Sequence, residues 1–161
     1  MARLFRLDRA LIRVAGPEAH DFLHNLLTQS VAPLPAPRYA ALLNPQGKVI
    51  ADVILWPEAN GVVLEASVER GADLVRRLTM YKLRAQVSVS DASDALGIVW
   101  SEAPFDNAAA DPRFPDGRLG YRRPAPIEET SDLPNGAAPF DALRIAIGVP
   151  DLARDALGEE V

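Results

Sequence analysis

The side chain of this sequence best placed to do chemistry is Asp52, which lies inside a run of apolar residues, 49–56. A second apolar run, residues 39–43, precedes it, and Asn44-Pro45-Gln46-Gly47 separates the two. Pro at the second turn position and Gly at the last are typical of a β-turn, so the sequence predicts a hairpin. Asp52 would then share one face of the second strand with Lys48, Ile50, Ile54 and Trp56, and both faces would be mostly apolar.

Two interpretations of Asp52 follow from this setting. Burying a carboxylate without a partner costs several kcal/mol, so the residue needs either a protein partner or a ligand. Asp52 is therefore a core residue held by a hydrogen bond or salt bridge, or it belongs to a strand face that lines a ligand cavity. The spacing of residues alone leaves both interpretations open.

The two histidines lie one helical turn apart, in His20-Asp21-Phe22-Leu23-His24. This spacing resembles the zinc-protease motif only superficially, because Asp replaces the general-base Glu and no third ligand is evident. We expect both imidazoles to be solvated or to cap backbone groups, and we predict no metal site. Likewise, we expect the pairs Arg76-Arg77 and Arg122-Arg123 to be solvated and Trp56 and Trp100 to lie in the core.

The composition excludes several classes of function. The 161 residues carry a net charge of −5, which argues against non-specific nucleic-acid binding. No apolar run reaches membrane-spanning length, and the first residues lack the pattern of a signal peptide. Without cysteine the chain forms no disulfide and no cysteine-ligated metal site. We expect a cytoplasmic protein that has neither nucleic-acid nor membrane partners.

The order of the predicted elements indicates an α+β fold on antiparallel sheet rather than alternating βαβ units. Apolar periodicity predicts helices over residues 17–28, 70–83 and 139–148. Besides the two strands of the hairpin, strands are predicted at residues 10–15, 62–66, 86–90, 97–100 and 118–122, with a turn at Asn60-Gly61.

The second part of the chain is rich in proline. Residues 102–138 are expected to be irregular apart from the strand at 118–122, with a mobile loop at 127–136. We therefore expect two parts: an α+β lobe at 1–101, and a proline-rich segment at 102–161 with a short strand and helix.

Five pieces of sequence match one protein family in order and spacing. They are Gly16-Pro17-Glu18-Ala19 with Phe22-Leu23 and Leu27-Thr28; residues 39–52; Leu78-Thr79-Met80-Tyr81-Lys82-Leu83-Arg84; Asp111-Pro112-Arg113 with Leu119-Gly120-Tyr121-Arg122; and Leu143-Arg144-Ile145-Ala146-Ile147-Gly148-Val149-Pro150. Together they resemble the N-terminal half of the folate-binding family related to the glycine-cleavage T-protein, an aminomethyltransferase, and above all its bacterial YgfZ-like branch. Mitochondrial relatives of this branch assist iron–sulfur cluster assembly. The resemblance implies a T-protein-like folate-binding fold.

The sequence departs from the family pattern at three places. The branch carries a downstream Lys-Gly-Cys-x-x-Gly-Gln-Glu motif, whereas this sequence ends before that point and looks like an N-terminal portion leading toward an absent C-terminal half. T-proteins have an acidic pair after the hairpin turn, of which Asp52 alone is kept here. Their Asn-Ala-Ser-like strand end reads Glu65-Ala66-Ser67, which puts the T-protein reaction in doubt. We accordingly assign no catalytic residue.

The resemblance implies that Asp52, Glu65 and Ser67 bind the cofactor, tetrahydrofolate, in a partial site. A carboxylate accepts the amino and ring N–H donors of a pterin, and an apolar face suits its flat ring. If Trp56 paired with Val62, Ala66 would lie opposite Asp52. A slip of one residue would bring Glu65 or Ser67 close instead.

We expect a folate-binding accessory protein of iron–sulfur cluster assembly or repair with no turnover of its own. The alternatives are a tetrahydrofolate-dependent aminomethyltransferase-type enzyme and a non-catalytic interaction domain. The expected partners are folate and iron–sulfur proteins or their assembly factors. Because the family's folate channel is walled by more than one lobe, we expect this chain alone to bind tetrahydrofolate weakly or not at all. We expect the full-length family protein to bind it and to lose affinity in Asp52→Ala.

Overall fold

The computed structural model describes residues 2–152, which form two compact units. Unit 1 contains the residues up to Arg9 and Ser93–Pro150, and unit 2 is Ala10–Ala92, so unit 2 is inserted into the sequence of unit 1. This division differs from the expected boundary between residues 101 and 102. The reason is that β1 (Phe5–Leu7) pairs with β7 (Leu96–Ser101), and β7 pairs in turn with a strand of the proline-rich stretch.

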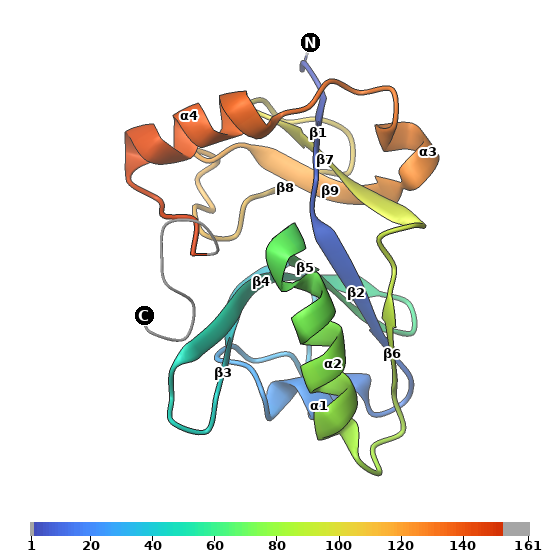
Figure 1. The fold of residues 1–161 in the computed structure, drawn as a ribbon. Coiled ribbons are helices and arrows are strands. Elements are labelled where there is room, and N and C mark those ends of the chain that lie inside the picture. Colours follow the sequence, from blue (N-terminus) through green and yellow to red (C-terminus); the bar gives the residue numbers. More distant parts are fainter. Residues whose placement is uncertain (1, 153–161) are drawn as a thin grey trace. The chain divides into compact units, whose positions relative to one another are not determined.

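Unit 2 is built on a five-stranded antiparallel sheet in the order β3-β4-β5-β2-β6 (Figure 1). The strands are β2 (Ala10–Ala15), β3 (Arg38–Leu43), β4 (Val49–Glu58), β5 (Gly61–Ala66) and β6 (Ser88–Asp91). The predicted hairpin of β3 and β4 is confirmed. Asn44 Oδ1 closes its turn by accepting the backbone N–H groups of Gln46 and Lys48 at 3.0 and 2.9 Å, and Gly47 adopts a φ of +84°.

A β-bulge interrupts the pairing of β3 with β4. Leu42 pairs with Ala51 but Leu43 pairs with Val49, so Ile50 is an extra residue on β4. Ile50 is buried in the core cluster that also contains Ala51. The prediction that Ile50 shares the face of Asp52 was therefore wrong, because the bulge breaks the alternation of side chains.

Two helices and a short 3₁₀ turn complete unit 2: α1 (Ala19–His24), η1 (Val68–Arg70) and α2 (Gly71–Lys82). Leu23 of α1 and Leu74 and Leu78 of α2 pack into one core with the sheet, so both helices cover the same face (Figure 1). The helix predicted over 17–28 is shorter in the structure. After His24 the chain turns to the edge of β3, where the Thr28 N–H donates to the carbonyl of Ala41 at 3.1 Å.

Unit 1 contains a four-stranded antiparallel sheet in the order β1-β7-β9-β8, with β8 (Ala109–Ala110) and β9 (Tyr121–Pro126). The strand predicted at 118–122 begins later, because Gly117 and Gly120 adopt positive φ values in the turn before it. It then continues through Pro124 to Pro126. Proline is tolerated there because β8 pairs with only the first two residues of β9.

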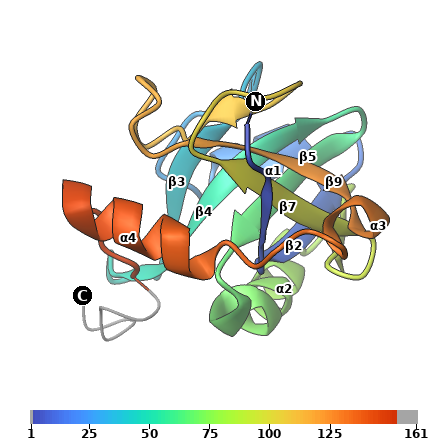
Figure 2. The ribbon, with the colours of Figure 1, turned by 90° about the horizontal axis from the view of Figure 1, so that it is seen from above.

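Two helices follow this sheet, α3 (Ile127–Thr130) and α4 (Ala137–Ile147), and Figure 2 shows them at opposite ends of unit 1. The mobile loop predicted at 127–136 was wrong. Its first part is α3, and its last part is fixed by backbone hydrogen bonds of Arg6 with Pro134 and Gly136, at 2.9 and 2.8 Å. The third predicted helix is confirmed as α4, which ends at Gly148 in the left-handed conformation.

A buried ion cluster fixes the proline-rich stretch of unit 1. Asp111 is 0% exposed and Arg122 is 1% exposed. Arg113 binds the Asp111 carboxylate through two hydrogen bonds of 2.9 and 2.7 Å, and Arg122 Nη2 lies 3.1 Å from the same carboxylate. The expectation that Arg122 is solvated was therefore wrong. The Arg122 guanidinium also lies over the ring of Phe140 in α4. The cluster therefore joins β9 to the segment around Asp111 and to α4.

Burial and the neighbouring arginines have opposite effects on the pKa of Asp111. Burial raises the pKa of the Asp111 carboxyl, whereas the charge of Arg122 and the hydrogen bonds and charge of Arg113 lower it. The arginines prevail, and the pKa of Asp111 lies below its ordinary value.

Among the described residues, no helix is long and apolar enough to cross a membrane.

Candidate functional site

The face of the five-stranded sheet that α1 and α2 leave uncovered carries a row of polar side chains, and we call it the polar face. The strand register establishes its membership. Tyr39 pairs with Ile54, Ile54 pairs with Glu65, and Val63 pairs with both Trp56 and Arg13. Because paired residues share a face, the polar face comprises Arg13, Tyr39, Asp52, Trp56, Glu58 and Glu65.

The register of β4 with β5 differs by one residue from the simplest expectation. Trp56 pairs with Val63 rather than Val62. The slipped alternative is therefore the one that occurs, and Glu65 instead of Ala66 shares the face of Asp52. Continued past the end of β5, the same register brings Ser67 level with Asp52.

Asp52 is half-buried and is held by a tyrosine. Tyr39 Oη donates a hydrogen bond of 2.7 Å to Asp52 Oδ2. Its other oxygen, Oδ1, takes part in no hydrogen bond found among residues 2–152, so the carboxylate keeps the capacity to accept further N–H groups. Asp52 therefore has a protein partner, as a core aspartate would. Its second oxygen can still accept a hydrogen bond, as a ligand-facing aspartate would require.

Glu65 is the most deeply buried carboxyl group of the polar face, at 0% exposure. Trp56 Nε1 donates a hydrogen bond of 3.0 Å to its Oε1. Trp56 is itself buried, which confirms its predicted place in the core. Sequence reasoning found both residues but missed their pairing, because the pairing depends on the register of β4 with β5.

The hydroxyl of Ser67 lies just past the end of β5. Its Oγ atom is buried and has no hydrogen-bond partner in the part of the chain that the structure describes. Leaving a buried polar atom unpaired costs about 1–3 kcal/mol, so such an atom calls for an explanation. A ligand group that bonds to Oγ would supply one.

A charged pair lies toward the other end of the polar face. Arg13 binds Glu58 through two hydrogen bonds of 2.6 and 2.9 Å, in the fork-like geometry that arginine forms with carboxylates. The hydrogen bond to Glu58 raises the pKa of Arg13. This pair was not predicted from the sequence, because Arg13 and Glu58 come close only when β2 and β4 flank β5.

The chemistry of this face favours hydrogen-bond acceptance. Asp52 and Glu65 supply carboxyl oxygens, Ser67 adds a hydroxyl, and the apolar side chains of Leu11, Ile54 and Val63 lie between them on the same face. These acceptors match the N–H donors of a flat heterocycle such as a pterin, and in the structure Leu11, Ile54, Val63 and Glu65 are buried. Within the described residues, no three side chains of His, Asp or Glu come together as metal ligands.

The other motifs singled out in the sequence have structural partners. His24 Nδ1 accepts the backbone N–H of Val31 at 3.1 Å, which is the expected capping role. Arg76 and Arg77 both bind Asp73 on α2, at 2.5 and 2.8 Å. None of these side chains contributes to the polar face.

The hydrogen bond between Trp56 and Glu65 is open to a direct test. We expect Trp56→Phe to destabilise the protein by about 2 kcal/mol, because a fully buried carboxyl group loses the indole N–H bound to its Oε1. The measurement is urea-induced unfolding of Trp56→Phe, Glu65→Leu and the double variant. A strong favourable coupling energy is expected between the two sites, and simple additivity would contradict the hydrogen bond.

Known proteins similar to this chain confirm the family resemblance. No family model matches. The chain is 32% identical over 156 residues to the mitochondrial iron–sulfur cluster assembly factor IBA57 homolog of Pyricularia oryzae, covering 86% of this chain and 40% of that protein. It is 32% identical over 189 residues to the human mitochondrial factor IBA57, covering 94% of this chain and 52% of the human protein. The chain spans about half the length of the curated relatives that it matches.

A solved structure confirms the fold. The chain matches the crystal structure of the glycine cleavage system aminomethyltransferase T from Bartonella henselae with a TM-score of 0.63 and 21% sequence identity. The match covers 92% of this chain and 47% of the enzyme. The predicted α+β, T-protein-like fold with antiparallel sheets is therefore correct.

Proposed function

We propose that this chain acts as a folate-binding accessory protein in iron–sulfur cluster assembly or repair. The reason is that it is homologous to the iron–sulfur cluster assembly factors IBA57 over most of its length. The observation that carries the proposal is the similarity to the human factor along 94% of the chain. The matched relatives are mitochondrial by name, and the cytoplasmic location expected from the sequence stays a prediction. The proposed partners are folate and iron–sulfur proteins or their assembly factors.

The residues proposed to hold tetrahydrofolate are Asp52, Glu65 and Ser67. Two observations support them: the oxygen Oδ1 of Asp52 keeps its acceptor capacity, and the buried Oγ of Ser67 has no partner within residues 2–152. Tetrahydrofolate supplies one-carbon chemistry when it is bound. The role proposed for these three side chains is to accept the N–H donors of its pterin ring and to orient it on the apolar part of the face.

The proposal involves no turnover by this chain. On the polar face, Asp52 accepts a hydrogen bond from Tyr39 and Glu65 accepts one from Trp56, so both carboxyl groups are held as acceptors. The likeness to the aminomethyltransferase concerns the fold. Formation of methylenetetrahydrofolate by the chain would instead support the aminomethyltransferase-type alternative.

The test is a titration of the ¹⁵N-labelled chain with tetrahydrofolate, followed by amide chemical shifts, because the expected binding is weak. We expect saturable shifts grouped at Asp52, Glu65 and Ser67. Asp52→Ala should lower the affinity by roughly tenfold, since it removes a charge-assisted acceptor.

Two matched variants control this experiment. Tyr39→Phe removes the hydrogen bond to Asp52 but keeps the carboxylate, so it should retain most of the affinity. Asp94→Asn changes an exposed carboxylate in unit 1 and should leave the affinity unchanged. Absence of shifts on the polar face, or equal affinity of the wild type and Asp52→Ala, would refute the folate role of this face.

A further inference from the structure

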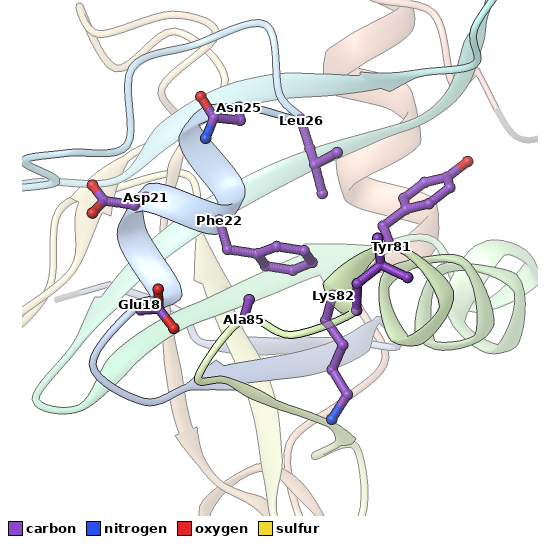
Figure 3. A pocket seen from close by; sticks show the side chains of 9 residues that line it. Glu18, Asp21, Phe22, Asn25, Leu26, Tyr81, Lys82 and Ala85 are labelled. Atoms are coloured by element: carbon purple, nitrogen blue, oxygen red, sulfur yellow. The ribbon is translucent and has the colours of Figure 1, made fainter.

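Asparagine followed by glycine is the residue pair that deamidates most readily in proteins. The backbone nitrogen of the second residue attacks the side-chain carbonyl carbon of the asparagine, and glycine has no side chain to hinder the attack. At Asn25 the next residue is Leu26, which packs against the core and which Figure 3 shows directed into the space between α1 and α2. Asn60 and Asn135, in contrast, both precede glycine, so their surroundings decide which of them reacts.

The structure protects Asn135. Its side-chain Oδ1 accepts the backbone N–H of Ala137 at 2.9 Å, and its Nδ2 lies 3.4 Å from Asp8 Oδ2. The attacking nitrogen belongs to Gly136, which is buried and donates to the carbonyl of Arg6 at 2.8 Å. Both reacting groups are held, so a reaction there requires this segment to detach from β1.

Asn60 lacks this protection. It is exposed, and its side chain takes part in no hydrogen bond found among residues 2–152. It is the second residue of the two-residue turn between β4 and β5, which the pair Glu58–Gly61 closes. That pair is the last of the hairpin, so the Gly61 nitrogen is released when the hairpin opens at its end alone. The Gly16 N–H donates to the Asn60 carbonyl at 2.9 Å, and this bond polarises the peptide group and makes the N–H of Gly61 more acidic.

We propose that Asn60 is a site of spontaneous deamidation, which converts it to aspartate and isoaspartate and opens the end of the β4–β5 hairpin. Hydroxide removes the proton of the Gly61 N–H, the nitrogen bonds to Asn60 Cγ, the Cγ–Nδ2 bond breaks, and Nδ2 leaves as ammonia. Water then opens the cyclic imide. Attack at the former side-chain carbonyl gives aspartate, and attack at the main-chain carbonyl gives isoaspartate. Water is the sole co-reactant, and the proposal is independent of the folate role of the polar face.

The products alter the end of the polar face. Both add a negative charge two residues after Glu58, the partner of Arg13. Isoaspartate also lengthens the main chain by one methylene group inside a turn of two residues. Sliding of β5 does not absorb this extra length, because Gly61 is also paired with Ala15 of β2. The pair Glu58–Gly61 is therefore the one that breaks.

The test ages the purified 161-residue chain at mildly alkaline pH and follows positions 60 and 135 by peptide mass spectrometry. Electron-transfer fragmentation distinguishes isoaspartate from aspartate. We expect Asn60 to lose its amide at least roughly tenfold faster than Asn135, because only the closing pair of its turn must open. Synthetic peptides of residues 57–64 and 132–139 give the rates of the two pairs without the fold. Equal rates at the two positions of the folded chain, or an intact Asn60 after the 57–64 peptide has reacted fully, would overturn the proposal.

Asn60→Gln is the matched variant, because cyclisation of glutamine forms a larger ring and is much slower. After ageing, the wild type should separate in anion exchange into an intact and a more acidic species, whereas Asn60→Gln should stay a single species. The isoaspartate form should unfold at a lower urea concentration than the intact wild type. An acidic species that also forms in Asn60→Gln would place the modification elsewhere, and an unchanged urea midpoint would show that the hairpin end stays closed. Each of these two results would contradict the proposal.

Discussion

Asp111→Asn is expected to destabilise the protein by about 3–5 kcal/mol, because it leaves two arginines around a buried group that no longer carries charge. Arg122, at 1% exposure, has no route to solvent as the structure stands. Equilibrium unfolding in urea at neutral pH measures the change. The matched control is Asp116→Asn. Asp116 pairs with Arg118 at the surface of the same unit, with more than half of each side chain exposed, so little change is expected.

The pH dependence of the unfolding free energy, compared between the wild type and Asp111→Asn, gives an independent check. The pKa of Asp111 is lower in the folded state than its ordinary value, so its ionisation stabilises the fold above the unfolded-state pKa near 4. This contribution is lost as the pH falls through the folded-state pKa. The difference in unfolding free energy between the wild type and Asp111→Asn should therefore narrow below about pH 4. A difference that stays constant down to pH 2 would show that the charge of Asp111 contributes nothing.

Gly61→Ala is expected to destabilise the protein by about 3 kcal/mol, through a collision of the new methyl group with the neighbouring strand. A Cβ atom built on Gly61 would lie 2.1 Å from the backbone oxygen of Val14 and 2.9 Å from Cα of Ala15. Because the obstacle is backbone, β2 and β5 would have to separate. Thermal unfolding and urea unfolding both measure this loss.

Gly47→Ala separates this clash from ordinary glycine strain. Gly47 has a φ of +84°, and a Cβ atom there meets nothing within 4 Å. Its replacement should cost only about 1 kcal/mol, the usual penalty for a side chain in a left-handed conformation. Equal losses in Gly47→Ala and Gly61→Ala would mean that β2 yields freely to the new methyl group.

The elements with strong local signals could be predicted from the sequence. Leu74 and Leu78 are spaced for one helical face and are buried in α2 as expected. The turn at Asn44 and Gly47 and the carboxylate of Asp52 in an apolar strand were equally visible. In each case the chemistry of neighbouring residues decides the structure.

The partner of Asp52 was hidden by the bulge at Ile50. Counting outward from the turn without a bulge pairs Tyr39 with Val53, which would place the tyrosine in the core. The extra residue shifts the pairing so that Tyr39 is opposite Ile54, and its hydroxyl reaches Asp52. A shift of one residue in the strand register thus decides which side chains meet, and the apolar periodicity of the sequence does not reveal such a shift.

The proline-rich stretch was misjudged for a different reason. Prolines and small residues between 102 and 138 indicate irregular chain by every local rule. The order there comes from contacts between distant segments, such as Asp111 with Arg122 and β9 with β7. Such contacts override local preference and are not readable from composition.

The discontinuity of unit 1 has a consequence for protein synthesis. The ribosome releases β1 before unit 2, yet its partner β7 follows only after the whole of unit 2, since Phe5 pairs with Trp100. All the strands and helices of unit 2 lie between these two segments, so unit 2 can acquire its structure while β1 is still waiting. Throughout that interval β1 offers Phe5, Leu7 and an open backbone edge to other nascent chains. A strand that is made before unit 2 is thereby protected only after unit 2 is complete.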